Sequence, residues 1–178
     1  KPVPGDNEVL VRVHATAVTS GDCRMRSFTV PLHLWIPSRI ALGLMRPRRP
    51  IPGLFLAGEV ERAGKDVTAF TKGDRIYART PDLRFGAYAQ YACLPEKGMI
   101  VRKPANMTYE EAVAIPFGGL TALYFLKKAG LRGGQKVLVY GASGAVGTSA
   151  LQLAKHLGAT VTGVCSAANL EMVKSLGA

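Results

Sequence analysis

The stretch Lys136–Gly147, which reads K-V-L-V-Y-G-A-S-G-A-V-G, decides the fold of the second half of this chain. Val137–Tyr140 is a short apolar run with β preference, as in a strand that is buried on both faces. Glycines follow at positions 141, 144 and 147, and Thr148–Leu157 then carries apolar residues at helical spacing. Thr160–Cys165 is a second strand candidate. The pattern predicts one βαβ unit.

A glycine turn between a strand and a helix is suited to binding a diphosphate. Glycines let the backbone pass close beneath the phosphates, and the first amides of the helix present a partial positive charge to them. The placement of the motif after a strand and before a helix favours this interpretation over a tight turn without a ligand. We therefore predict that a dinucleotide contacts Ser143, Gly144, Ala145, Val146 and Gly147.

The turn departs from the spacing G-x-G-x-x-G because Ala142 occupies the first glycine position. Gly141–Gly147 instead resembles the G-A-x-G-x-V-G turn of the zinc-independent, zeta-crystallin-like quinone oxidoreductases of the medium-chain dehydrogenase/reductase superfamily. The resemblance covers nearly the whole chain and implies an α/β plus β protein. A GroES-like, partly open β-barrel (residues 1–103) would precede linker helices and the first half of a Rossmann doubly wound parallel sheet (residues 104–178). It also implies a chain truncated at both ends.

The first half of the sequence agrees with a small barrel. Short alternating strands with Gly and Pro punctuation are predicted at Glu8–Ala15, Arg75–Ala78 and Gly86–Pro95. The longest apolar region, Phe28–Met45, is too interrupted by proline and charge to span a bilayer. We expect it to form short amphipathic helical pieces packed on the domain, and we favour this over an interfacial membrane role.

Two helices are predicted between the barrel and the βαβ unit. Thr108 and Glu111 match a capping box, so one helix begins there and ends at Pro116. The second covers Phe117–Gly130. The resemblance places a threonine of the pattern G-x-T-A near the nicotinamide, and Thr121 matches it. From the residues alone, Thr121 is better explained as a helical threonine bonding back to its own backbone, and the resemblance brings the cofactor role level with that explanation.

The positions that hold catalytic zinc in related enzymes lack the ligands for it. By the resemblance, Thr19 stands in place of a zinc-binding cysteine and Asp22 matches an aspartate three residues later. Gly53-Leu-Phe55 replaces G-H-E, and Phe55 should make the substrate pocket more apolar. A tetrahedral zinc site needs three protein ligands, so we predict no metal. Thr19 and Asp22 are the candidate catalytic residues, and a structural turn with Asp22 capping a helix is the alternative.

The end of the second strand indicates which nucleotide binds. In dinucleotide folds an acidic residue there accepts hydrogen bonds from the adenosine ribose, and it would repel a 2′-phosphate. Here the sequence continues as C-S-A-A-N, with Ser166 and Asn169 available to the cofactor and no acid. This favours NADP(H) over NAD(H). The related pattern C-S-x-R-N has an arginine where Ala168 stands, so the preference is weakened.

Composition and charge restrict the remaining possibilities. The chain has 178 residues, a net charge of +11 and three cysteines without pairing spacing, which indicates a reducing compartment and a cytoplasmic protein. Arg46, Arg48 and Arg49 form the densest basic cluster, but no aromatic residues interleave with them. We interpret this cluster as a solvated loop and predict neither a nucleic-acid nor a membrane partner.

The predicted function is hydride transfer from NADPH to a quinone or an activated alkene or carbonyl compound, without zinc. By the resemblance, the full-length form would be a homodimer with a small-molecule quinone or enone substrate. The isolated fragment is expected to be poorly active. The alternative is a non-catalytic nucleotide-binding or structural protein that retains the fold, and a nucleic-acid binder is a weaker third hypothesis.

Overall fold

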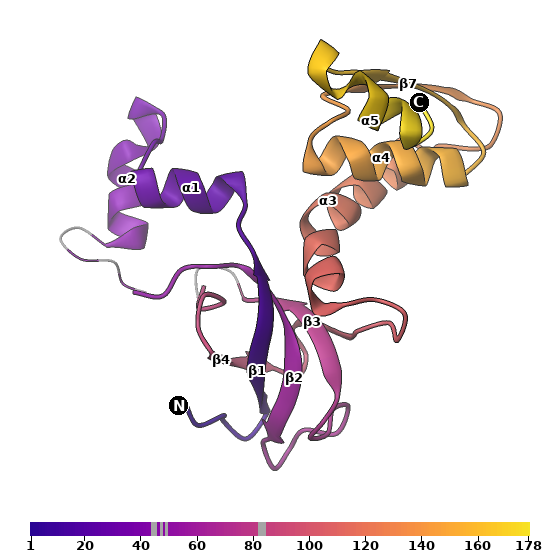
Figure 1. The fold of residues 1–178 in the computed structure, drawn as a ribbon. Helices are drawn as coiled ribbons and strands as arrows, with labels where there is room; N and C mark the ends of the chain where they lie inside the picture. Colours follow the sequence, from indigo (N-terminus) through magenta and orange to yellow (C-terminus); the bar gives the residue numbers. More distant parts are fainter. Residues whose placement is uncertain (44–45, 47, 49, 82–84) are drawn as a thin grey trace. The chain divides into compact units, whose positions relative to one another are not determined.

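The computed structural model describes residues 1–43, 46, 48, 50–81 and 85–178, so Arg49 of the predicted basic cluster lies outside the described residues. The chain forms two compact units, Lys1–Val113 and Ala114–Ala178. The division falls within helix α3 (Tyr109–Lys128), which is labelled in Figure 1. The domain boundary at residues 103 and 104 stays a prediction.

The first unit is built on a five-stranded antiparallel sheet (Figure 1). Its strands are β1 (Glu8–Ala17), β2 (Phe55–Ala63), β3 (Arg75–Arg79), β4 (Tyr91–Pro95) and β5 (Met99–Arg102), in the order β4-β1-β2-β3-β5. Two register shifts bend β1 against β2, which is how an open sheet curls into a half-barrel. Alternating side chains fill the concave core, among them Val9, Val11, Leu56, Val60, Ile76 and Leu94.

The second unit contains the predicted βαβ element. Strands β6 (Lys136–Tyr140) and β7 (Thr160–Val164) pair in parallel and are joined by helix α4 (Ala145–His156). One turn of 3-10 helix (Ala167–Asn169) and helix α5 (Leu170–Ser175) follow. The apolar face of α4 meets the sheet in a core that includes Val139, Leu151, Ala154, Val161 and Val173. The predicted fold class, an antiparallel half-barrel followed by a short parallel sheet, is therefore confirmed.

The prediction of two helices separated at Pro116 is wrong. The Thr108–Glu111 capping box is present, with hydrogen bonds of 2.8 and 3.2 Å, but α3 then continues through Pro116 to Lys128. Proline in a helix removes one backbone hydrogen bond and costs about 3 kcal/mol. Buried apolar residues continue at helical spacing on both sides of it, including Ala112 and Leu126. Their burial offsets that cost.

The predicted strand Gly86–Pro95 is also too long, because only its second half pairs with β1 as β4. The amides of Gly86 and Tyr88 donate to the carbonyl of Pro52, and the amide of Ala87 donates to that of Gly53. These bonds draw the segment away from the sheet and towards the loop before β2. Tyr88 therefore lies outside β4, and its side chain does not follow the alternating directions of strand residues.

Two helices follow β1, namely α1 (Ser20–Ser27) and α2 (Leu32–Leu42). Helical pieces were predicted after Phe28, but α2 is not amphipathic and none of its residues is buried. The description of this region as helices packed on the domain is therefore wrong for α2. Within the described part of the chain, no helix is both long enough and apolar enough to cross a bilayer.

Candidate functional site

The glycine turn is fixed at the carboxyl end of the parallel strands. Gly141 adopts a φ of 76°, which favours glycine, and its amide donates to the carbonyl of Val164 at 3.0 Å. The amide of Ala142 donates to the same carbonyl at 2.9 Å. Helix α4 begins at Ala145 rather than at the predicted Thr148. The first turn of α4 therefore contains Ala145, Val146 and Gly147 themselves.

Gly147 holds the helix close to the turn. A Cβ atom at this position would lie 2.2 Å from the carbonyl oxygen of Gly141 and 2.8 Å from the Cα atom of Ala142. Such distances are far inside van der Waals contact, so only glycine fits. The close approach aims the open end of α4 over the loop from Gly141 to Gly144.

That open end is suited to an anion. Gly144 is the N-terminal cap residue, no side chain bonds to the first amides, and the first turn carries no acidic residue. The first amides of a helix lack partners within the helix and carry partial positive charge. Gly144 and Ala145 are exposed, and Ser143 and Val146 are half-buried. The turn therefore fits the diphosphate of a dinucleotide.

Ser166 and Asn169 lie beyond the end of β7. Because β6 and β7 run in parallel with Tyr140 opposite Val164, the residues after both strands share one edge of the sheet. The side-chain amide of Asn169 donates to Ser166 Oγ at 3.0 Å, which leaves the serine hydroxyl free to donate elsewhere. Ala168 is exposed between them.

Thr121 lies one turn along α3 from a close contact with α4. A Cβ atom on Gly118 would be 2.2 Å from the carbonyl oxygen of Ala145, so α3 passes directly against the first turn of α4. The hydroxyl of Thr121 donates to the carbonyl of Phe117 at 2.6 Å. The structure thus shows the backbone bond of an ordinary helical threonine, and a role for Thr121 at the nicotinamide stays a prediction.

Thr19 and Asp22 lie in the first unit, where they form a capping box at the start of α1. The amide of Thr19 donates to Asp22 Oδ2 at 2.8 Å, and the Thr19 hydroxyl donates to the same oxygen at 2.6 Å. Asp22 is only 6% exposed, and its other oxygen, Oδ1, has no hydrogen-bond partner among the described residues. A buried carboxylate oxygen without a donor is costly, so it marks a place where a ligand can bind.

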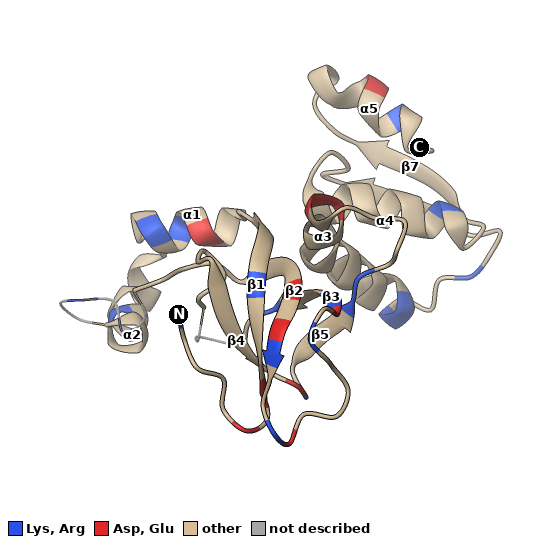
Figure 2. Ribbon diagram, turned by 60° about the horizontal axis from the view of Figure 1, so that its bottom comes forward, with Lys and Arg blue, Asp and Glu red and all other residues tan. Residues whose placement is uncertain are grey.

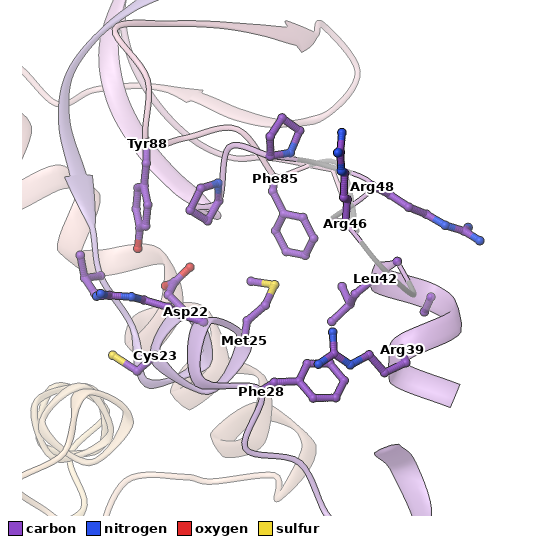
Figure 3. A pocket seen from close by; sticks show the side chains of 16 residues that line it. Asp22, Cys23, Met25, Phe28, Arg39, Leu42, Arg46, Arg48, Phe85 and Tyr88 are labelled. Atoms are coloured by element: carbon purple, nitrogen blue, oxygen red, sulfur yellow. The ribbon is translucent and has the colours of Figure 1, made fainter. Parts of the chain in front are cut away.

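A pocket of about 690 Å³ opens beside Asp22, between α1, α2 and the loops that precede β2 and β4 (Figure 3). This volume lies within the usual range for small-molecule sites. Apolar side chains form much of its wall, namely Val18, Met25, Phe28, Leu42 and Phe85. Figure 3 shows the Tyr88 hydroxyl and the Asp22 carboxylate at one end of the pocket and Arg39 at the other.

Tyr88 is fixed by its surroundings. Its ring packs on Gly53, where a Cβ atom would lie 2.4 Å from the ring, and its hydroxyl donates to the carbonyl of Ala17 at 3.2 Å. Burial and then the nearby Asp22 carboxylate raise the pKa of Tyr88 to about 12. The phenol therefore remains protonated at neutral pH, and its one hydroxyl hydrogen is donated to the carbonyl of Ala17.

Residues 5–105 match the family described as the alcohol dehydrogenase GroES-like domain. The chain belongs to this family. It is 39% identical, over 99% of its length and 52% of the relative, to the chloroplast envelope quinone oxidoreductase homolog of Arabidopsis thaliana. It is 34% identical, over 97% of its length and 45% of the relative, to the mitochondrial NAD(P)H oxidoreductase of Mus musculus.

Among solved structures, the quinone oxidoreductase from Coxiella burnetii matches this GroES-like chain with a TM-score of 0.86 and 30% identity. The match covers 99% of this chain and 53% of that one. The chain spans about half the length of the curated relatives it matches. The resemblance to medium-chain quinone oxidoreductases is confirmed.

Several features of the GroES-like unit were not predicted. Tyr88 was assigned to a strand, and no sequence signal placed Phe28 or Arg39 beside Asp22. Phe55 was expected to line the substrate pocket, but it packs in a core cluster with Ala57 and Val113 instead. Within the described ranges, no three His, Cys, Asp or Glu side chains gather closely enough to hold a metal ion.

Proposed function

We propose that this chain binds NADP(H) and serves in the transfer of a hydride from NADPH to a quinone or to an activated alkene or carbonyl compound, without zinc. The glycine turn carries the proposal, because Gly147 can hold α4 this close to Gly141 only without a side chain. The exposed, uncapped start of α4 then provides amides for a diphosphate. The oxidoreductase names of the relatives support the reaction class.

The cofactor would be held by the second unit. The amides of Ala145 and Val146 would bind the diphosphate. Ser166 would donate its free hydroxyl to a 2′-phosphate, and no acidic residue lies between Val164 and Leu170 to repel it. Lys174, the nearest lysine after this segment in the sequence, is not assigned to the phosphate, because its ammonium group pairs with Glu171 at 3.2 Å on α5. NADP(H) is therefore preferred over NAD(H), although the site lacks an arginine at position 168.

The substrate would be held by the first unit, in the pocket beside Asp22. When bound, NADPH supplies the hydride, and a quinone that takes up this hydride and one proton becomes a hydroquinone. The apolar wall suits a ring, and Asp22 Oδ1 would accept a hydrogen bond from a hydroxyl of the reduced product. Thr19 would act as a positioning residue, because its amide and hydroxyl bind the other carboxylate oxygen and leave Oδ1 without a partner among the described residues.

The cofactor proposal is tested by titrating the chain with NADPH and with NADH and following the fluorescence of the reduced nicotinamide. We expect saturable binding, tighter for NADPH. Binding that does not saturate with either nucleotide would overturn the proposal. Consumption of NADPH by the full-length form in the presence of a naphthoquinone, a conjugated enone or a simple alcohol then assigns the reaction, and we expect turnover with the first two only.

The substrate proposal is tested by Asp22→Asn, which keeps the shape of the side chain. Removing the charged acceptor should weaken binding of a hydroquinone about tenfold or more, because hydrogen bonds to charged groups contribute about 1.5–3 kcal/mol. Binding of NADPH should not change. Asp6→Asn is the matched control, since Asp6 forms an exposed ion pair with Lys65 at 3.0 Å and lies outside the pocket lining. Equal effects of the two substitutions would refute the role of Asp22.

Two further parts of the proposal concern the whole protein. We keep a homodimer as the expected state of the full-length form, to be measured by sedimentation equilibrium. A cytoplasmic location also stays a prediction, and fractionation of the native host would test it.

A further inference from the structure

Helix α2 is predominantly apolar and yet lies at the surface. Seven of its eleven residues are apolar and none is buried. Leu32, Ile36 and Ile40 follow one another at four-residue spacing, and they are 90%, 65% and 52% exposed. A helix of this composition is normally buried in a protein core or in lipid. The exposed strip therefore marks an interaction surface.

The segment around α2 carries positive charge only. Between Cys23 and Gly58 the sequence contains six arginines and no Asp or Glu, namely Arg24, Arg26, Arg39, Arg46, Arg48 and Arg49. None of the five that the structure describes forms an ion pair with another described residue. Figure 2 shows that acidic residues of this unit gather mainly on the strands and turns away from α2. Arg39 lies over the rings of Phe28 and Trp35, and it lines the pocket beside Asp22 together with Arg26, Arg46 and Arg48. The apolar strip and these cations thus belong to one acid-free segment.

We propose that α2 and the surrounding arginines dock on the surface of an anionic lipid bilayer. Leu32, Ile36 and Ile40 would enter the interface, and the guanidinium groups would lie among the headgroup phosphates. Trp35 is 44% exposed on the same helix, and tryptophan is favoured at membrane–water interfaces. The helix would lie in the plane of the surface. This inference does not depend on the proposed oxidoreductase function.

Charge and apolarity together favour a bilayer over two other occupants. A nucleic acid would use the arginines but would gain nothing from Leu32, Ile36 and Ile40. A second copy of the chain could cover the apolar strip, but it would bring two acid-free, arginine-rich surfaces together, and like charges oppose that contact. An anionic bilayer satisfies both features at once.

Trp35 makes the test specific, because it is the only tryptophan in the chain. The 178-residue chain is mixed with vesicles of phosphatidylcholine alone, and with vesicles in which about a third of the lipid is phosphatidylglycerol. We expect flotation with the anionic vesicles only, together with a blue shift of the Trp35 emission as α2 leaves water. Absence of flotation, or flotation without the emission shift, would overturn the proposal.

Two variants separate the contributions of the two features. Ile36→Glu should reduce vesicle binding at least tenfold. Val3→Glu is the control: it also replaces an exposed aliphatic side chain by glutamate, at a residue that is 78% exposed outside α2, and it should have no comparable effect. Arg46→Gln with Arg48→Gln should reduce binding about fivefold for each charge removed. Circular dichroism confirms that each variant is folded.

Two outcomes would replace the bilayer by another partner. If duplex DNA displaces the vesicles and binds the Ile36→Glu variant as well as the unaltered chain, the arginines form a nucleic-acid site. If sedimentation shows a dimer that Ile36→Glu dissociates and vesicles do not bind, the strip is a self-association surface. Either result refutes the proposal.

Discussion

Replacing Gly147 by alanine tests the close approach on which the cofactor site depends. The added Cβ atom would meet the Gly141 carbonyl oxygen at 2.2 Å and the Ala142 carbonyl carbon at 2.9 Å. Both contacts are with backbone, so no side-chain rotation relieves them. Helix α4 would have to move by about 1 Å, away from a core in which Leu151 and Ala154 are fully buried.

The size of the effect follows from two opposing contributions. Overpacking of this kind costs about 1–3 kcal/mol, and backbone contacts place it at the upper end. Alanine regains up to about 1 kcal/mol as the better helix former. The net loss in the free energy of unfolding is then about 2 kcal/mol. For a unit as small as Ala114–Ala178 this lowers the melting temperature by about 8–16 °C.

The measurement is thermal unfolding followed by far-ultraviolet circular dichroism. Fluorescence of Trp35, which lies in the first unit, serves as the internal reference. Gly144→Ala is the matched control in the same turn, because its φ of −80° suits any residue and its Cβ atom would lie 3.5 Å from the Gly141 oxygen. We expect Gly144→Ala to change stability by less than about 1 kcal/mol.

Cofactor binding gives the second readout. The Gly144→Ala methyl group would stand at the exposed start of α4, where the diphosphate is proposed to bind, so NADPH affinity should fall although the fold is kept. If Gly147→Ala melts like the unaltered chain, or if both substitutions destabilise equally, the close approach does not exist and the reasoning fails.

Three other predictions follow from single contacts. Gly118→Ala should lower the melting temperature, because its Cβ atom would lie 2.2 Å from a carbonyl oxygen of α4, whereas Gly119→Ala should be neutral or stabilising since only a side chain at 3.1 Å must adjust. Ala168→Arg should tighten NADPH binding about tenfold and leave NADH unchanged, as fluorescence titration with both nucleotides would show. Tyr88 should ionise only near pH 12, because burial and the Asp22 carboxylate raise its pKa. The contribution of this shift to the free energy of unfolding is present below pH 10 and is lost as the pH rises through 12. An alkaline absorbance titration checks this, since Tyr88→Phe should remove the last tyrosine to titrate, and an unchanged curve would contradict the assignment.

The sequence by itself determined the elements whose signals are local. The strand at Val137–Tyr140, the glycine turn and the capping box at Thr108 each depend on neighbouring residues, and each is present in the structure. The alternation in Glu8–Ala15 was sufficient for β1 for the same reason. The capping role of Asp22 is also a local signal, and the structure confirms it. Its candidacy as a site residue comes from the family resemblance and stays a prediction. The prediction that the strand at Val137–Tyr140 is buried on both faces is wrong, because Leu138 and Tyr140 are 67% and 87% exposed.

Tertiary structure decided what depends on residues far apart in the chain. Pro116 should end a helix, but burial of side chains on both sides keeps α3 continuous. Tyr88 joins Asp22 because hydrogen bonds to Pro52 and Gly53 draw its segment away from β4. The exposure of α2 also depends on packing. From its apolar sequence alone, this helix is expected to pack on the domain, but none of its residues is buried. Local patterns fix backbone conformation, whereas long-range packing and burial decide which side chains face water, core or pocket.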